Sequence, residues 1–154
     1  MRSTQVAVFV HLVWATWDRL PLLTDENRPP IYCAIGAKCE ELRVDVLAIG
    51  GVEDHVHLLV QLPATLAIAE LVKHVKGASS HLANFRLSDG GSFRWQGSYA
   101  AFPVGKDAIP RVVSSITNQR RHHQSNTLDP EGELPFASEA LATPHASGLP
   151  HRSR

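Results

Sequence analysis

The sequence contains little that would mark a secreted or membrane protein. Its 154 residues include only two cysteines, Cys33 and Cys39, whose spacing is typical of neither a zinc knuckle nor a redox pair. The longest apolar stretch, residues 6–15, is interrupted by His11 and is far shorter than the roughly 20 residues of a membrane-spanning helix. No small-residue cleavage site follows it, so we expect no signal peptide. These absences predict reduced thiols in a cytoplasmic protein without a membrane partner.

The chain also lacks net charge, since 15 lysines and arginines balance 15 aspartates and glutamates. Taken alone, this balance argues against a basic nucleic-acid-binding protein. The charges are unevenly distributed, however. Residues 55–125 hold eight basic and three acidic residues, a formal charge of +5, and acidic residues prevail in both flanking segments. The middle segment can therefore meet phosphates, although a solvated helix face explains the same charges.

The length and composition fit one domain of ordinary size. Residues 125–154 are rich in proline, serine, alanine and acidic residues and have no hydrophobic periodicity. We therefore expect a folded domain over residues 1–124 and a disordered tail over residues 125–154.

Hydrophobic periodicity predicts four strands and three helices. The strands are expected over 6–16, 44–49, 55–62 and 99–104, and the helices over 31–42, 65–85 and 108–124. Pro29 and Pro30 suit the first turn of the first helix, and Thr65 and Asp107 are candidate N-caps of the others. The order predicts an α+β, ferredoxin-like β-α-β-β-α-β fold, an antiparallel sheet with helices on one face, and an additional C-terminal helix.

Two histidines, His55 and His57, lie in the strand that follows a Gly-Gly turn. Alternate strand residues share a face, so both imidazoles are expected to point the same way, opposite to Val56 and Leu58. Such a pair can chelate a divalent metal, but two histidines on a polar strand face are also often simple surface. A histidine-triad hydrolase would need a third histidine at position 59, which is Leu59.

The last predicted helix carries a row of polar side chains. Ser115, Gln119 and His122 are four and then three residues apart, so they lie on one helix face. The amide oxygen of Gln119 can complete a His, His, Gln metal set. A solvated polar face is the alternative.

Several ordered motifs resemble those of a known family. They are residues 53–60 (EDHVHLLV), 73–80 (KHVKGASS), 93–102 (FRWQGSYAAF) and 118–123 (NQRRHH), preceded by 11–16 (HLVWAT). Together they resemble the single-tyrosine HUH transposases of small bacterial insertion sequences and their repeat-associated relatives. The resemblance extends over about residues 6–124.

The resemblance implies a ferredoxin-like domain, commonly a homodimer, that binds single-stranded hairpin DNA and cleaves and joins its strands. It assigns His55, His57 and Gln119 as ligands of Mg²⁺ or Mn²⁺. The family's nucleophilic tyrosine lies four residues before the glutamine, where this sequence has Ser115. A serine hydroxyl is shorter than a phenol and a poorer leaving group, so we expect impaired or absent cleavage.

Three functions remain open at this point. The first is an active transposase that uses Ser115 or a repositioned tyrosine as the nucleophile. The second is a domesticated module that binds hairpin DNA or RNA without cutting it. The third is a metal-dependent phosphoesterase that uses metal-bound water and forms no covalent intermediate.

Further residues are predicted to bind nucleic acid. Lys73 and Lys76, with Ser80 one turn on, can grip phosphates from the second helix, although a solvated lysine face is equally reasonable. Arg94 and Trp95 can clamp an unstacked base, although Trp95 suits the core as well. Arg120, beside the expected metal ligand, is the sixth of these candidates.

Overall fold

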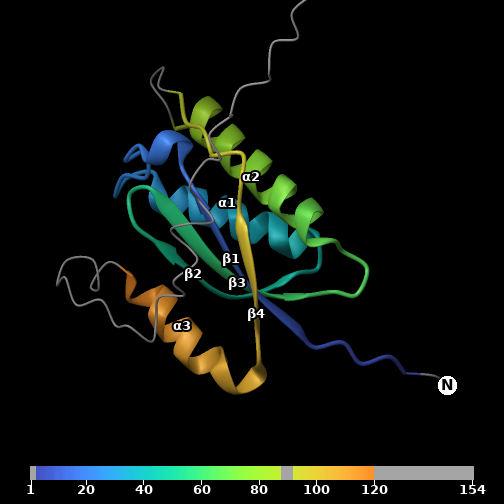
Figure 1. Cartoon of the computed structure of the whole chain (residues 1–154). Coiled ribbons are helices and arrows are strands. Elements are labelled where there is room, and N and C mark those ends of the chain that lie inside the picture. The colour runs from blue at the N-terminus through green and yellow to red at the C-terminus, as the bar shows by residue number, and fades with distance from the viewer. Residues whose placement is uncertain (1–2, 88–91, 120–154) are drawn as a thin grey trace, which may run out of the picture.

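The computed structural model describes residues 3–87 and 92–119, which form one sheet with helices on both of its faces (Figure 1). The strands are β1 (Val8–Ala15), β2 (Asp45–Gly51), β3 (His55–Leu62) and β4 (Ala100–Val104). The helices are α1 (Arg28–Glu41), α2 (Ile68–Phe85) and α3 (Ile109–Thr117), with short 3-10 turns η1 (Trp17–Arg19) and η2 (Lys106–Ala108). None of the helices in these ranges is long and apolar enough to cross a bilayer.

The strands form a fully antiparallel sheet in the order β2-β3-β1-β4. β3 pairs with β1 so that His57 lies opposite Val13, and with β2 so that His57 lies opposite Gly50. The two central strands are therefore β3 and β1, and β1 lies in the longest apolar stretch of the sequence. This arrangement confirms the predicted α+β ferredoxin-like fold with an additional C-terminal helix.

One face of the sheet carries the main hydrophobic core. Alternate residues of β1 and β3 enter it, and α1 and α2 cover it with side chains at helical spacing, as the period of each element requires. The cluster includes Leu12, Trp14, Ile31, Ile35, Val56, Leu58, Leu71 and Val75. α1 begins with Pro29 and Pro30 in its first turn, as predicted. It ends before Arg43, whose φ of 59° is left-handed, a common way to stop a helix.

α3 packs on the opposite face of the sheet, against β2 and β3 (Figure 1). Gly50 makes this contact possible, because a Cβ atom there would lie 2.2 Å from the backbone oxygen of Ile116. Ile116 is buried against Ala48 and Leu59 in a smaller apolar cluster. The prediction of helices on one face thus holds for α1 and α2, and α3 is the element that covers the other.

Two predicted helix caps are wrong. Thr65 lies in a turn closed by the Leu66 amide and the Pro63 carbonyl, and α2 begins only at Ile68. Asp107 lies in η2, and α3 begins after Ala108 without a side-chain cap. The predicted extension of the last helix through residues 120–124, the glycine-rich loop at 88–91 and the predicted tail lie outside the described residues.

Candidate functional site

The histidine pair lies on the α3 side of the sheet. His55 and His57 are 7% and 8% exposed, and their ring centroids are 5.0 Å apart. Between and beyond them, Val56 and Leu58 point into the main core on the other side. The predicted alternation is therefore confirmed, whereas the alternative of two surface histidines is wrong, because both residues are buried.

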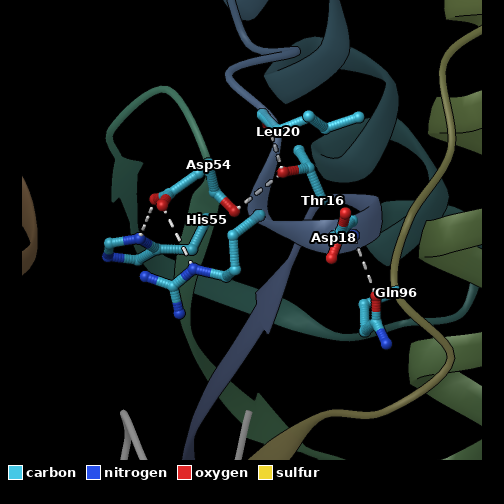
Figure 2. Close-up of polar contacts among 7 residues, drawn as sticks. Thr16, Asp18, Leu20, Asp54, His55 and Gln96 are labelled. Carbon is cyan, nitrogen blue, oxygen red and sulfur yellow. Dashed lines mark hydrogen bonds and ion pairs between the residues drawn. The ribbon is translucent and has the colours of Figure 1, made fainter. Parts of the chain in front are cut away.

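Each of these imidazoles is bonded through Nδ1. The Nδ1 atom of His55 lies 2.6 Å from Oδ1 of Asp54, and that of His57 lies 2.9 Å from Nε2 of His11 on β1 (Figure 2 shows the first contact). A partner at one ring nitrogen fixes the tautomer and orientation of a metal-binding histidine, with the other nitrogen as the ligand atom. His11 begins one of the sequence motifs but was not predicted as a site residue, although its alternate position in β1 places it on the same face as His57.

Charge around the pair is set by burial and by one carboxylate. Burial lowers the pKa of His11 to about 4, so its imidazole is neutral near pH 7. Burial alone would raise the pKa of the Asp54 carboxyl, but its hydrogen bond and charge interaction with His55, together with Arg19, lower it overall. Arg19 Nε lies 3.1 Å from Oδ2 of Asp54. Asp54 is therefore an ionised carboxylate shared by His55 and Arg19.

α3 brings the other predicted residues to this side of the sheet. Gln119, just beyond the helix, is 7% exposed, and Ser115 is half-buried. In the sequence, both residues lie close to Ile116. Ile116 contacts Gly50 of β2, and Gly50 lies opposite His57 in the sheet. His122 lies outside the described residues.

The donor set fits a divalent cation. Two imidazoles held through Nδ1, with an amide oxygen on the covering segment, are ligand types that suit metals such as Mn²⁺. Within residues 3–87 and 92–119, no three His, Cys, Asp or Glu side chains form a metal-binding group. The family resemblance assigns the Gln119 amide as a third ligand.

Both tyrosines of the chain belong to the core side of the sheet, where the Tyr32 hydroxyl comes close to the backbone at Gly51. Tyr32 on α1 and Tyr99 before β4 are the only two tyrosines in the sequence, and both pack against the main core. That core lies between the sheet and the helices α1 and α2, whereas His57 lies opposite Gly50, which contacts Ile116 of α3 on the other face. Neither phenol is on the side of the sheet that carries His55 and His57.

The two lysines that were predicted to bind phosphate together have different roles in the structure. Lys73 is exposed on α2, but the Lys76 ammonium donates to the carbonyls of Gln96 and Ser98, each at 2.8 Å. Burial lowers the pKa of Lys76 to about 8. Ser80 donates to the carbonyl of Gly77 on its own helix. Lys76 thus ties the segment before β4 to α2, and Lys73 remains available to phosphate.

Arg94 and Trp95 point in different directions. Trp95 is buried in the main core, with its Nε1 donating to Ser79 Oγ at 2.9 Å. Arg94 is exposed, and its guanidinium carbon lies 3.8 Å from the ring centroid of Trp17. The predicted aromatic partner of Arg94 is therefore replaced by Trp17, which lies 77 positions earlier in the chain. Arg120 lies outside the described residues.

Comparisons with known proteins agree with these motifs. Residues 4–119 match the sequence profile of a family described as "Transposase IS200 like". This range includes the histidine pair, Ser115 and Gln119. No curated protein matches the chain.

Solved structures give the same answer for the fold. The chain is similar to a candidate transposase from Deinococcus radiodurans R1, with 26% identity, a TM-score of 0.60, and coverage of 77% of this chain and 95% of that one. It is also similar to a REP-associated tyrosine transposase bound to a REP hairpin, with 14% identity and a TM-score of 0.61. That match covers 80% of this chain and 72% of the other, and at this identity it bears on the fold alone.

Proposed function

The chain belongs to the IS200-like transposase family, and from this premise we propose that it binds single-stranded hairpin DNA but cleaves it poorly or not at all. Two features support this. The face of the sheet covered by α3 retains a buried histidine pair with both Nδ1 atoms held. The position that the resemblance assigns to the nucleophile, however, is a serine.

The observation that carries the proposal is the position of the tyrosines. An attacking phenol must reach a phosphate beside His55 and His57, and both Tyr32 and Tyr99 pack into the core on the other side of the sheet. This argues against a repositioned tyrosine. Ser115 lies on the correct helix, but its hydroxyl is short and needs an activating base to attack a phosphodiester.

The remaining residues have binding roles. His55, His57 and Gln119 would hold Mg²⁺ or Mn²⁺, which when bound withdraws charge from a phosphoryl oxygen. Asp54 and His11 would keep the two imidazoles in their orientations. Lys73, Arg94 and Arg120 would contact phosphates or bases, mainly positioning the strand. The domain limits at residues 124 and 125 and the homodimer implied by the resemblance are also part of the proposal, and light scattering on the full chain tests the dimer.

The test is a search for a covalent protein–DNA adduct. The native chain is incubated with a single-stranded hairpin and Mn²⁺ and resolved on a denaturing gel, with binding followed separately by mobility shift. We expect a salt-sensitive shift and no adduct. An adduct that disappears in Ser115→Ala would overturn the proposed loss of cleavage, and cleavage without an adduct would favour a phosphoesterase.

A gain-of-function variant sharpens the test. Ser115→Tyr should restore some adduct if the rest of the site is intact. Ser114→Tyr is the matched control, because Ser114 is exposed on the same helix and one position turns the phenol by about 100° around the axis. Adduct from both variants, or from Ser114→Tyr alone, would contradict the assignment of position 115, and adduct from neither would mean that more than the nucleophile has decayed. No mobility shift with any hairpin would contradict DNA binding itself.

A further inference from the structure

Trp17 is the exposed aromatic ring beside the histidine site. Trp17 is 41% exposed, whereas the other two tryptophans, Trp14 and Trp95, are buried. The guanidinium carbon of Arg94 lies over this ring, 3.8 Å from its centroid. A planar cation against an indole forms a flat surface, of the kind on which unpaired bases stack in single-strand-binding proteins.

Hydrogen bonds to residues 94 and 96 hold this surface in place. The Trp17 amide donates to the Arg94 carbonyl at 2.9 Å, and the Asp18 amide donates to Oε1 of Gln96 at 3.1 Å (Figure 2 shows the second contact). Asp18 and Arg19 follow with φ values of 53° and 54°, which L side chains rarely adopt. Strained backbone of this kind persists where surrounding contacts impose it, and it clusters at functional sites.

The same loop is joined to the histidine pair. The Thr16 hydroxyl, which is fully buried, contacts the carbonyls of Leu20 and Asp54 at 2.6 and 3.1 Å (Figure 2). The Asp54 side chain bonds His55 on one oxygen and Arg19 on the other. The Trp17 surface is therefore connected to the candidate metal site through one loop and one carboxylate.

We propose that Trp17 and Arg94 form a stacking site for one unpaired base of single-stranded DNA, at the edge of the His55–His57 site. The inference rests on the proposed DNA-binding function and adds where an unpaired nucleotide next to the hairpin is held. Asp18 lies in the same loop and its carboxylate opposes phosphate, so the affinity gained here comes from stacking more than from charge. The loop would hold the stacked base in one position. Because Asp54 bonds both Arg19 of this loop and His55, that position would be fixed relative to the His55 imidazole.

The test uses the full chain and two probes, a blunt DNA hairpin and the same hairpin with a short single-stranded thymidine tail. Trp17→Ala should weaken binding of the tailed hairpin by about tenfold, as expected for loss of one stacked base. Binding of the blunt hairpin should change little. Trp17→Phe should recover most of the loss because it restores an aromatic face.

The matched control is Leu20→Ala, which removes an exposed apolar side chain from the same loop without removing a π surface. It should leave binding of both probes unchanged, and circular dichroism confirms that each variant is folded. Fluorescence gives a second measurement, since the tailed probe should quench the native chain and not Trp17→Phe.

The outcomes separate the two proposals. If the native chain binds neither probe, the proposed function fails. If it binds both probes and Trp17→Ala loses nothing, or loses equally on both, the stacking site is wrong while DNA binding stands. Quenching that persists in Trp17→Phe would also overturn the stacking site.

Discussion

The two faces of the sheet are built from the same strands but hold different chemistry. On β3, Val56, Leu58 and Val60 enter an apolar cluster closed by two long helices. Their neighbours His55 and His57 lie on the face that the short helix α3 covers, where His57 contacts the buried imidazole of His11. Buried polar groups cost free energy unless they are hydrogen-bonded, and here each imidazole has a bonded partner. The first face stabilises the fold, and the second keeps polar groups that the fold alone does not need.

The two faces differ most clearly at the adjacent residues His57 and Leu58. Of the changes considered, Leu58→Ala should have the largest effect on the free energy of unfolding. Leu58 is fully buried in the main cluster, so the free energy of unfolding should fall by about 2–5 kcal/mol. Urea unfolding measures it, with Val8→Ala as the control because Val8 is 48% exposed on β1. An equal, small loss in both variants would contradict the assignment of the core face.

His57→Asn tests the opposite face, one residue away. The amide of asparagine can stay near the Nδ1 position and keep a bond to His11, while the ligand atom of the imidazole is lost. Removing a partner of a metal ligand costs 10–100-fold in affinity, so removing the ligand itself should weaken Mn²⁺ binding by about 100-fold or more. Calorimetric titration measures the affinity, and urea unfolding should change far less than in Leu58→Ala. Unchanged Mn²⁺ affinity would remove His57 from the metal site.

Much of this contrast was predictable from the sequence. Alternation in residues 55–62 correctly separates His55 and His57 from Val56 and Leu58, because a strand has a period of two. The helical spacing in residues 65–85 likewise predicts a helix there, and α2 forms over Ile68–Phe85. Periodic elements are predictable because local geometry alone assigns each side chain to a face.

Other parts required the tertiary structure. The partner of His57 is His11, and the partner of Arg94 is Trp17, and each pair is distant in the chain. Trp95 was a candidate because it adjoins Arg94, but the strand-like bridge between Thr16 and Trp95 points its ring into the core. Register between segments, which the sequence does not state, decides such contacts.

Gly50→Ala tests whether the packing of α3 affects only the histidine face of the sheet or the main core as well. A Cβ atom at Gly50 would meet the Ile116 backbone, so α3 must shift while the main core stays intact. We expect a loss of about 1–3 kcal/mol in urea unfolding and weaker Mn²⁺ binding, because Gln119 moves with α3. Gly36→Ala is the control, since nothing lies within 4 Å of a Cβ there and alanine should stabilise α1 by about 0.5–1 kcal/mol. If Gly50→Ala behaves like Gly36→Ala, the close packing of α3 is wrong.

Lys76→Met should have the smallest effect on the free energy of unfolding. It tests whether Lys76, on the α2 side of the sheet, stabilises the fold and does not bind phosphate. Burial lowers the pKa of Lys76 from its ordinary 10.5 to about 8. Between these pH values the unfolded chain holds a proton that the folded chain has lost, so the unfolding free energy rises with pH. Relative to Lys76→Met, the native chain should gain stability from pH 8 to 10.5, by less than about 2 kcal/mol because the half-buried amine stays partly hydrated. The neutral amine keeps two N–H groups, enough for the carbonyls of Gln96 and Ser98. A difference that falls over this range would mean that those carbonyls bind the ammonium more strongly than burial disfavours it.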